Sequence, residues 1–246
     1  MALLDHFRAQ PRQKHPDPAV RLTFVHEIPI DERDLLAEMA REDPDARVRR
    51  AAVAKLMDPT ALANVIATDA DPSVRSDAGA MLRDLALDAF EGVTEEVSLA
   101  AVDAISDAKI LAHIAKAALR GPIAARALAR INDAHALGSI ARHAVLEPIR
   151  LAALDALADP AEVVNVAMHG EFRDTAVAAV ERLIERHAEL EEIATGAKNK
   201  SAAKRARGLL RGDDDRSGAE PAGSQPASAE VVAVREIEAP ASDPVT

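Results

Sequence analysis

The chain has 246 residues, a formal charge of −11 and no cysteine, which excludes disulfides, thiolate metal sites and a cysteine nucleophile. Its apolar residues are mostly Ala and Leu, and four phenylalanines supply the only aromatic rings besides histidine. This composition favours helices that pack closely side by side. No stretch approaches the ~20 apolar residues of a membrane span, and residues 1–10 lack the pattern of a secretory signal. We therefore expect a cytoplasmic protein that does not enter a membrane.

A series of repeats begins at residue 15, after residues 1–14, which we expect to form an N-terminal capping segment. Three segments align without gaps, at residues 15–21, 43–49 and 69–75, and each places Asp or Pro before a Val-Arg pair. An aspartate can accept hydrogen bonds from the free N–H groups of a first helical turn, and proline fits that turn, so each segment predicts a helix start. Weaker copies of the valine position continue in the same register at Val97, Ile123 and Ile149.

A second marker lies between the Val-Arg pairs and consists of an apolar residue followed two positions later by an aspartate. Its aspartates, at spacings of 26, 23, 26 and 26 residues, are Asp58, Asp84, Asp107, Asp133 and Asp159. Two markers with one period predict a helix–turn–helix unit of about 26 residues, which is too small to bury its own apolar face and must stack on its neighbours. The sequence therefore predicts an all-α solenoid over residues 15–211.

Two alternating sets of helices follow from these markers. The helices that carry the valine position, called marker helices below, are expected at 18–28, 45–57, 72–86, 95–105, 122–131, 148–158 and 173–187. The alternating helices are expected at 31–42, 59–68, a short piece near 86–91, 107–119, 133–145, 160–169 and 188–197, with a last helix near 200–211. The unit around Glu91 and Gly92 is three residues short, so we expect an irregularity in the stack there.

The pattern Asp-Pro-x-Val-Arg-x-x-Ala-x-x-x-Leu resembles the short HEAT-like repeat, also called the phycobilisome-lyase-type HEAT repeat, over residues 15–211. The resemblance implies a right-handed α-α superhelix, a solenoid of about seven HEAT-like helical hairpins. The opening of the chain, residues 3–21, is also similar to the start of larger bacterial proteins in which such repeats precede a helical domain of unknown function.

Four arginines follow the valine position directly: Arg21, Arg49, Arg75 and Arg150. Such a series could bind phosphate groups. The resemblance implies instead that these side chains pack along the stack and pair with turn carboxylates, for which Asp43, Asp69 and Asp71 are suitably placed. We assign the arginines to structure.

The end of the chain changes in composition. Residues 212–246 are rich in Ala, Ser, Pro and acids, and residues 213–246 carry eight acids and two bases, which predicts a disordered acidic tail or linker. Its apolar island at 231–237 could be a short binding segment. Just before the tail lies a basic patch without acids: Lys198, Lys200, Lys204, Arg205, Arg207 and Arg211. It could bind an acidic surface, or its cations could simply favour the negative end of a helix dipole.

We expect no catalytic residues, cofactor or metal. The fold resembles that of a di-iron hydroxylase, in which His-Glu pairs from successive repeats bind iron, but here His26-Glu27 is the only such pair. His113, His135 and His143 stand at different offsets from their capping aspartates, so their side chains should not converge on one ion. A resemblance to a HEAT-like DNA glycosylase implies aromatic side chains that stack on a base, whereas this chain has neither Trp nor Tyr.

In HEAT-like stacks the marker helices line the concave face, so the resemblance implies a candidate binding surface there. Its residues are His26, Glu27, Lys55, Asp77, Met81, Asp103, Arg126, Arg130 and Asp155. These side chains are mixed in sign and suit an unknown protein or peptide, with only weak contact to nucleic acid at the basic patch. The sequence thus predicts a non-catalytic protein–protein interaction scaffold, and the resemblance of its opening implies that it is the N-terminal part of a larger bacterial protein. The alternative is a bilin-lyase-type or other HEAT-like enzyme or accessory protein.

Overall fold

The computed structural model describes residues 11–217, which form one short 3-10 helix and fourteen α-helices without a strand. The marker helices are α1 (Pro18–Glu27), α3 (Ala46–Val53), α5 (Pro72–Ala86), α6 (Glu95–Ala104), α8 (Gly121–Leu128), α10 (Glu147–Ala156) and α12 (Arg173–Glu181). The alternating helices are α2 (Arg33–Glu42), α4 (Pro59–Thr68), α7 (Ala108–Ala117), α9 (Ala134–His143), α11 (Pro160–His169) and α13 (His187–Gly196), and α14 (Lys200–Ser217) ends the series. The prediction of an all-α chain is confirmed.

Capping aspartates begin seven of the fourteen α-helices of the described chain. In the first three marker helices the side chains of Asp17, Asp45 and Asp71 each accept a hydrogen bond from the backbone N–H two residues later. The second marker has the same role in the alternating helices, where the capping residues are Asp58, Asp107, Asp133 and Asp159. Asp84 is the exception, because it lies inside α5 and begins no helix.

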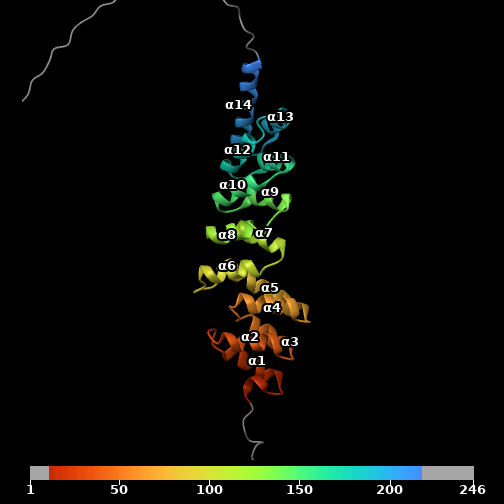
Figure 1. Ribbon diagram of the computed structural model, residues 1–246, viewed down its shortest axis with the longest axis vertical. Coiled ribbons are helices and arrows are strands. Elements are labelled where there is room, and N and C mark those ends of the chain that lie inside the picture. Colours follow the sequence, from red (N-terminus) through yellow and green to blue (C-terminus); the bar gives the residue numbers. More distant parts are fainter. Residues whose placement is uncertain (1–10, 218–246) are drawn as a thin grey trace, which may run out of the picture.

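The helices form two rows in one elongated stack (Figure 1). Helices two apart in the chain pack on each other along the whole stack, so α1, α3, α5, α7, α9, α11 and α13 form one row and the even-numbered helices form the other. Between the rows, the closest pairs join each alternating helix to the marker helix that follows it, as in α2 with α3 and α7 with α8.

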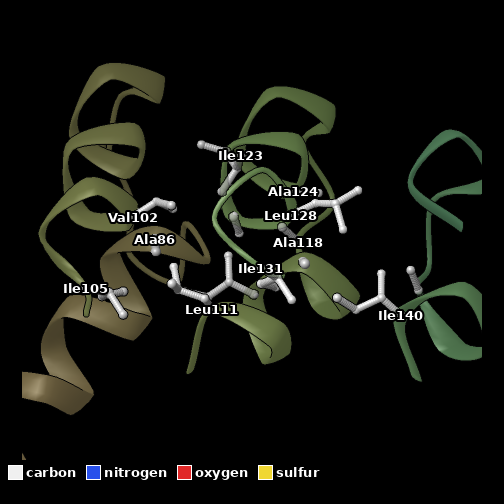
Figure 2. Packing of buried hydrophobic residues seen from close by; sticks show 14 of the residues in the cluster. Ala86, Val102, Ile105, Leu111, Ala118, Ile123, Ala124, Leu128, Ile131 and Ile140 are labelled. Atoms are coloured by element: carbon white, nitrogen blue, oxygen red, sulfur yellow. The ribbon is translucent and has the colours of Figure 1, made fainter. Parts of the chain in front are cut away.

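One apolar core runs between the two rows. Figure 2 shows a stretch of it, to which four successive helices contribute side chains: Val102 of α6, Leu111 of α7, Ile123 of α8 and Ile140 of α9. Many of the fully buried positions are alanines, which lets neighbouring helices approach closely. Burial of these faces against neighbouring units stabilises helices that are too short to be stable alone.

The expected short helix near 86–91 is wrong, because this segment is a turn. Helix α5 ends at Ala86 and Asp88 adopts a left-handed conformation with φ of 58°. The amide of Ala89 then donates to the Asp84 carbonyl and the amide of Asp88 donates to the Leu85 carbonyl. This pair of bonds is a Schellman ending, which stops α5 and leads the chain directly into α6.

The missing helix moves the marker helices from one row to the other. Helices α1, α3 and α5 lie in the odd-numbered row, whereas α6, α8, α10 and α12 lie in the even-numbered row. The described chain therefore has six marker–alternating helix pairs rather than about seven, with α5 standing between them. The predicted irregularity at this point is a change of row.

The two ends of the stack differ from the predicted boundaries. Of the capping segment 1–14, the structure describes a 3-10 helix at Arg12–Lys14 that packs on α1. The Arg12 guanidinium lies 5.2 Å from the centroid of the Phe24 ring and pairs with Glu27. At the other end α14 continues to Ser217, six residues beyond the predicted limit of 211, because Gly212 does not end it. Residues 1–10 and 218–246, with most of the predicted disordered tail and the island at 231–237, lie outside the described residues. Within the described range, no helix is long and apolar enough to cross a membrane.

Candidate functional site

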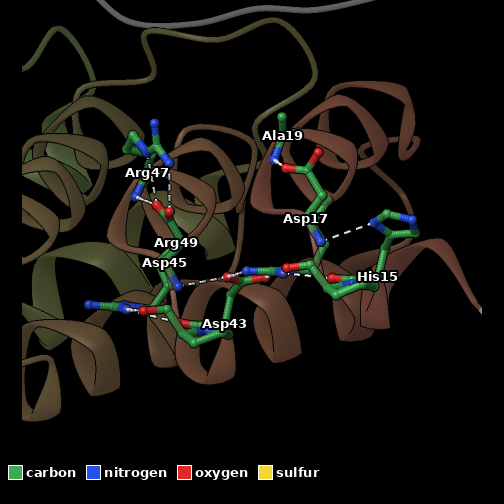
Figure 3. Close-up of polar contacts among 10 residues, drawn as sticks. His15, Asp17, Ala19, Asp43, Asp45, Arg47 and Arg49 are labelled. Atoms are coloured by element: carbon green, nitrogen blue, oxygen red, sulfur yellow. Dashed lines mark hydrogen bonds and ion pairs between the residues drawn. The ribbon is translucent and has the colours of Figure 1, made fainter.

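Three of the four repeated arginines form a ladder in which each ties its marker helix to the next layer of the same row, and these are Arg21, Arg49 and Arg150. Arg21 donates from Nε and Nη2 to the two carboxylate oxygens of Asp43, at 2.7 and 2.9 Å. Arg49 makes the same pair of bonds to Asp69, also at 2.7 and 2.9 Å. Figure 3 shows Asp43 in the turn between α2 and α3, two residues before Asp45, which caps α3. The predicted partners Asp43 and Asp69 are thus confirmed.

These ion pairs are largely shielded from water. The side chains of Arg21 and Asp43 are 7% and 3% exposed, and those of Arg49 and Asp69 are 13% and 4% exposed. The hydrogen bond from Arg49 lowers the pKa of Asp69 below its ordinary value, although burial opposes the shift. A planar guanidinium that meets both oxygens of a carboxylate also fixes the distance between repeats, so the ladder has a structural role.

Arg150 continues the ladder in the other row with a different set of partners. Its Nη2 donates to Asp174 at 2.6 Å and its Nε donates to the Thr175 hydroxyl at 3.2 Å. The guanidinium carbon lies 3.7 Å from the centroid of the Phe172 ring, within cation–π range. Burial works to raise the pKa of Asp174, but hydrogen bonds from Arg150 and the backbone outweigh it and lower the pKa.

Arg75 is the exception in the ladder. Its Nη1 donates to the carbonyls of Asp69 and Ala70, at 2.7 and 3.0 Å. Within residues 11–217 no carboxylate lies within ion-pair distance of its guanidinium, and the predicted partner Asp71 instead caps α5. The arrangement leaves the Nε–Nη2 edge of Arg75 available.

A groove with a volume of about 540 Å³ lies beside Arg75 and is called the α5 groove below. Its apolar lining comes from α4, with Ala63 and Ile66, from α5, with Gly79, and from the segment of Ile105 and Ile110 at the start of α7. Its polar lining residues are Arg75, Ser76, Arg83, Ser106 and Asp107. Arg83 pairs with Asp84 at 2.7 Å, so Arg75 is the cation of the groove that lacks a carboxylate partner in the described chain. An apolar lining with a directed cation is typical of a recognition site, so this groove is the strongest candidate site of the described chain.

The residues of the candidate concave face divide between the two rows. His26, Glu27, Lys55, Asp77 and Met81 lie on marker helices of the odd-numbered row, or directly after one. Asp103, Arg126, Arg130 and Asp155 lie on or directly after marker helices of the even-numbered row. The division follows from the turn after α5, which moves the marker helices to the other row, and binding of a partner at these residues stays a prediction.

Several residues of this face are engaged within the chain. Met81 is buried, with 7% exposure. Asp77 pairs with Arg50 at 2.6 Å, and Asp103 pairs with Arg126 at 3.0 Å. Of the other members, Glu27 pairs with Arg12, whereas the exposed His26 and Asp155 have no ion pair within the described residues.

A second ladder, which the sequence did not lead us to expect, uses cations ten residues after the capping position of a marker helix. Lys55 donates to the carbonyls of Val25, His26 and Ile28 at the end of α1. Arg130 and Arg182 cap the ends of α6 and α10 in the same way. Their equal offset from the capping position is visible in the sequence and could have identified them. Lys55 and Arg130 are therefore assigned to structure.

The basic patch lies on α14 and the turn before it, and two of its six cations have internal partners. Arg205 pairs with Glu181, and Arg207 donates to the Ala194 carbonyl at 2.7 Å. The remaining members, with no such side-chain contact in the described chain, are exposed: Lys198, Lys200, Lys204 and Arg211. Weak contact of this patch with an acidic partner stays a prediction.

The histidines of α9 and α11 lie near carboxylates. His135 lies 3.1 Å from Glu162 and His143 lies 3.2 Å from Glu171, and His143 and His169 line one hollow with Glu171. In the part of the chain that the structure describes, no group of three or more His, Cys, Asp or Glu side chains could hold a metal ion. The expected absence of a metal stays a prediction.

With this geometry in place, two comparisons with known proteins return nothing: no protein-family model matches the chain, and no curated protein matches it.

Proposed function

We propose that the chain is a non-catalytic protein-binding scaffold of HEAT-like repeats, wound as a right-handed superhelix and forming the N-terminal part of a larger bacterial protein. Three features support the repeat assignment. Capping aspartates recur with one period, equivalent arginines donate to equivalent carbonyls, and helices two apart pack throughout the stack. Each unit contacts only its near neighbours, as expected of a solenoid.

The single observation that carries a binding role is the α5 groove. Elsewhere the ion pairs and caps engage charges of the marker helices such as Arg21, Arg49, Lys55, Asp77 and Asp103, so these charges stabilise the stack and offer little to a partner. In the groove, Arg75 keeps a free edge among apolar residues and the polar residues Ser76, Arg83, Ser106 and Asp107. A pocket that is already formed lowers the cost of ordering on binding.

The test is cross-linking of the full chain to its partners in cells, followed by mass spectrometry of the linked peptides. We expect a protein partner whose cross-links map to α4, α5 and α7, and we expect them to disappear in the variant Gly79→Leu, which fills the groove. The matched control Gly208→Leu lies in α14, where the added side chain also meets no neighbouring atom.

Two results would overturn the scaffold assignment. A chromophore that co-purifies in a stoichiometric amount would support the bilin-lyase-type alternative. Zinc or iron present in a stoichiometric amount and lost on mutation of His113 or His143 would support an enzyme.

A further inference from the structure

The four repeated arginines hold the same pose, which makes their differences informative. In each, Nη1 donates to two consecutive backbone carbonyls just before its own helix, and the carbonyl pairs are His15–Pro16, Asp43–Pro44, Asp69–Ala70 and Ala144–Val145. These bonds fix the direction of the guanidinium. The opposite Nε–Nη2 edge is then presented at a defined angle to whatever lies in the next layer of the stack.

For Arg21 and Arg49 the next layer supplies an aspartate two residues before the cap of the following helix of the row. For Arg75 the corresponding helix is α7, capped by Asp107, and the residue two positions earlier is Ile105. The Asp107 carboxylate is already engaged, because it accepts hydrogen bonds from the amides of Lys109 and Ile110. Arg75 therefore faces the α5 groove at the place where Arg21 and Arg49 each face an aspartate carboxylate.

The walls of the groove also differ from equivalent positions elsewhere. Eight residues after the cap, the other alternating helices carry a buried alanine: Ala40, Ala115, Ala141, Ala167 and Ala194. Helix α4 carries Ile66 there, and Ile66 is only half-buried and lines the groove. In α5, a β-carbon added at Gly79 would meet no atom within 4 Å. Glycine in a helix interior is less favourable than alanine, and no packing contact within the described chain requires it here.

We propose that the α5 groove binds a segment of a partner protein in which an aspartate or glutamate side chain is flanked by apolar residues. The partner's carboxylate accepts two hydrogen bonds from the Nε–Nη2 edge of Arg75, and its apolar neighbours pack on Ile66, Gly79 and the half-buried Ile110. The inference rests on the proposed scaffold function and names the chemistry of its partner. Charge complementarity and the planar fork of Arg75 favour a carboxylate, and the apolar walls favour a peptide segment.

A peptide library tests this proposal even though the partner is unidentified. Random twelve-residue peptides, displayed so that no free C-terminus is presented, are selected on the full chain. We expect enriched peptides to contain an internal Asp or Glu between Leu, Ile, Val or Ala residues. Synthetic amidated copies should bind about tenfold or more weakly after Asp→Asn or Glu→Gln in the peptide, or after Arg75→Lys in the protein, because each change removes the bidentate pair.

Gly79→Leu separates binding from folding. This variant leaves Arg75 in place, and the leucine should raise the melting temperature of the helix-rich chain while it blocks the groove and abolishes peptide binding. Gly208→Leu should leave binding unchanged. A folding defect would lower the melting temperature. A variant with a raised melting temperature that no longer binds has therefore lost binding because the groove is blocked.

Either of two outcomes would overturn the proposal: no enrichment, or peptides that bind the Arg75→Lys or Gly79→Leu variant as tightly as they bind the unaltered chain. If cellular partners still cross-link to the chain and are insensitive to both variants, the scaffold function stands and the groove assignment fails. If no partner cross-links and a chromophore co-purifies, the scaffold function fails as well.

Discussion

Helices α1 to α5 and helices α6 to α14 share the marker pattern of the sequence, yet the marker helices of the two regions lie in opposite rows. In the first region all three marker helices lie in the odd-numbered row and carry the ladder arginine. In the second region the marker helices lie in the even-numbered row, and of their corresponding positions only Arg150 is an arginine, whereas Ser98 and Ala124 occupy two others.

The difference shows what the repeat pattern determines. The capping residue, the valine position and the arginine fix contacts within about one unit: a helix start, a buried side chain and two carbonyl bonds. None of these contacts depends on which row the helix joins. One unit lacks its second helix, and the marker helices after it therefore lie in the other row. Their local contacts are kept, and only the layer between α5 and α7 is altered.

The sharpest way to test this comparison is to remove the arginine in an intact layer and in the interrupted one. Arg49→Ala leaves the buried Asp69 carboxylate without its partner and should lower the free energy of unfolding by about 3 kcal/mol. Arg75→Ala removes only bonds to carbonyls and should cost about 1 kcal/mol. Urea denaturation followed by circular dichroism measures both. Equal losses would mean that Arg75 has a carboxylate partner after all.

Acid should lower the stability of the chain partly through the intact layer, in which Arg49 pairs with Asp69. The pKa of Asp69 is lowered by the hydrogen bond from Arg49, so the ionised carboxylate contributes stability that is complete above its unfolded pKa of about 4. This contribution is lost as the pH falls through the folded pKa, because the unfolded chain binds the proton first. Stability measured from pH 6 downward should fall less steeply in Arg49→Ala than in the unaltered chain. In Arg75→Ala the fall should change less than in Arg49→Ala, because Arg75 lowers the pKa of Asp69 only through its charge, which is the weakest of the effects. A change as large as that in Arg49→Ala would contradict the assignment.

The carbonyl-capping cations offer a third comparison, because Lys55 in the turn after α3 corresponds to Met81 in α5. Lys55→Met removes the bonds to three carbonyls at the end of α1 and should cost about 1–2 kcal/mol. The exposed Lys109 provides the matched control, since Lys109→Met should change stability by less than about 0.5 kcal/mol. A loss at Lys55 no greater than at Lys109 would mean that the second ladder does not stabilise the stack.

Local features of this fold were predictable from the sequence, and the change of row was not. Caps such as Asp45 and Asp58 act on amides two or three residues away, so the sequence is sufficient to place them. The path after α5 depends on one left-handed residue, Asp88, and on the loss of a cap at Asp84, whose sequence context matches that of the true caps.

The candidate site was hidden for a related reason. In the sequence Arg75 is equivalent to Arg49, and the difference lies in the turn that each faces across the stack. The nearest signal in the sequence is Gly92, which lies two residues before the cap Thr94. At the equivalent position, two residues before the cap, the earlier marker helices have Asp43 and Asp69. Which turn actually faces Arg75 follows from the order of the rows, and this order required the structure.

The turn after α5 should itself be sensitive to substitution, with the smallest of these effects. Asp88 has φ of 58° and pairs with Arg120 at 2.5 Å. A β-branched residue is poorly tolerated in this conformation, so Asp88→Val should lower the free energy of unfolding by about 1 kcal/mol. Asp88→Gly removes the same ion pair and relieves the backbone restriction, so it should be more stable than Asp88→Val.

Two further variants separate the backbone effect from the ion pair. Ala89→Val makes a similar change one residue later, where φ is not positive, and should cost less than Asp88→Val. Arg120→Ala removes the partner of Asp88, and because both side chains are partly exposed the pair should contribute about 0–1 kcal/mol. If Arg120→Ala accounts for the whole loss seen in Asp88→Val, the left-handed backbone is not what holds the turn. In that case the ion pair between Asp88 and Arg120, across the junction of the two regions, would be the feature that sets the change of row.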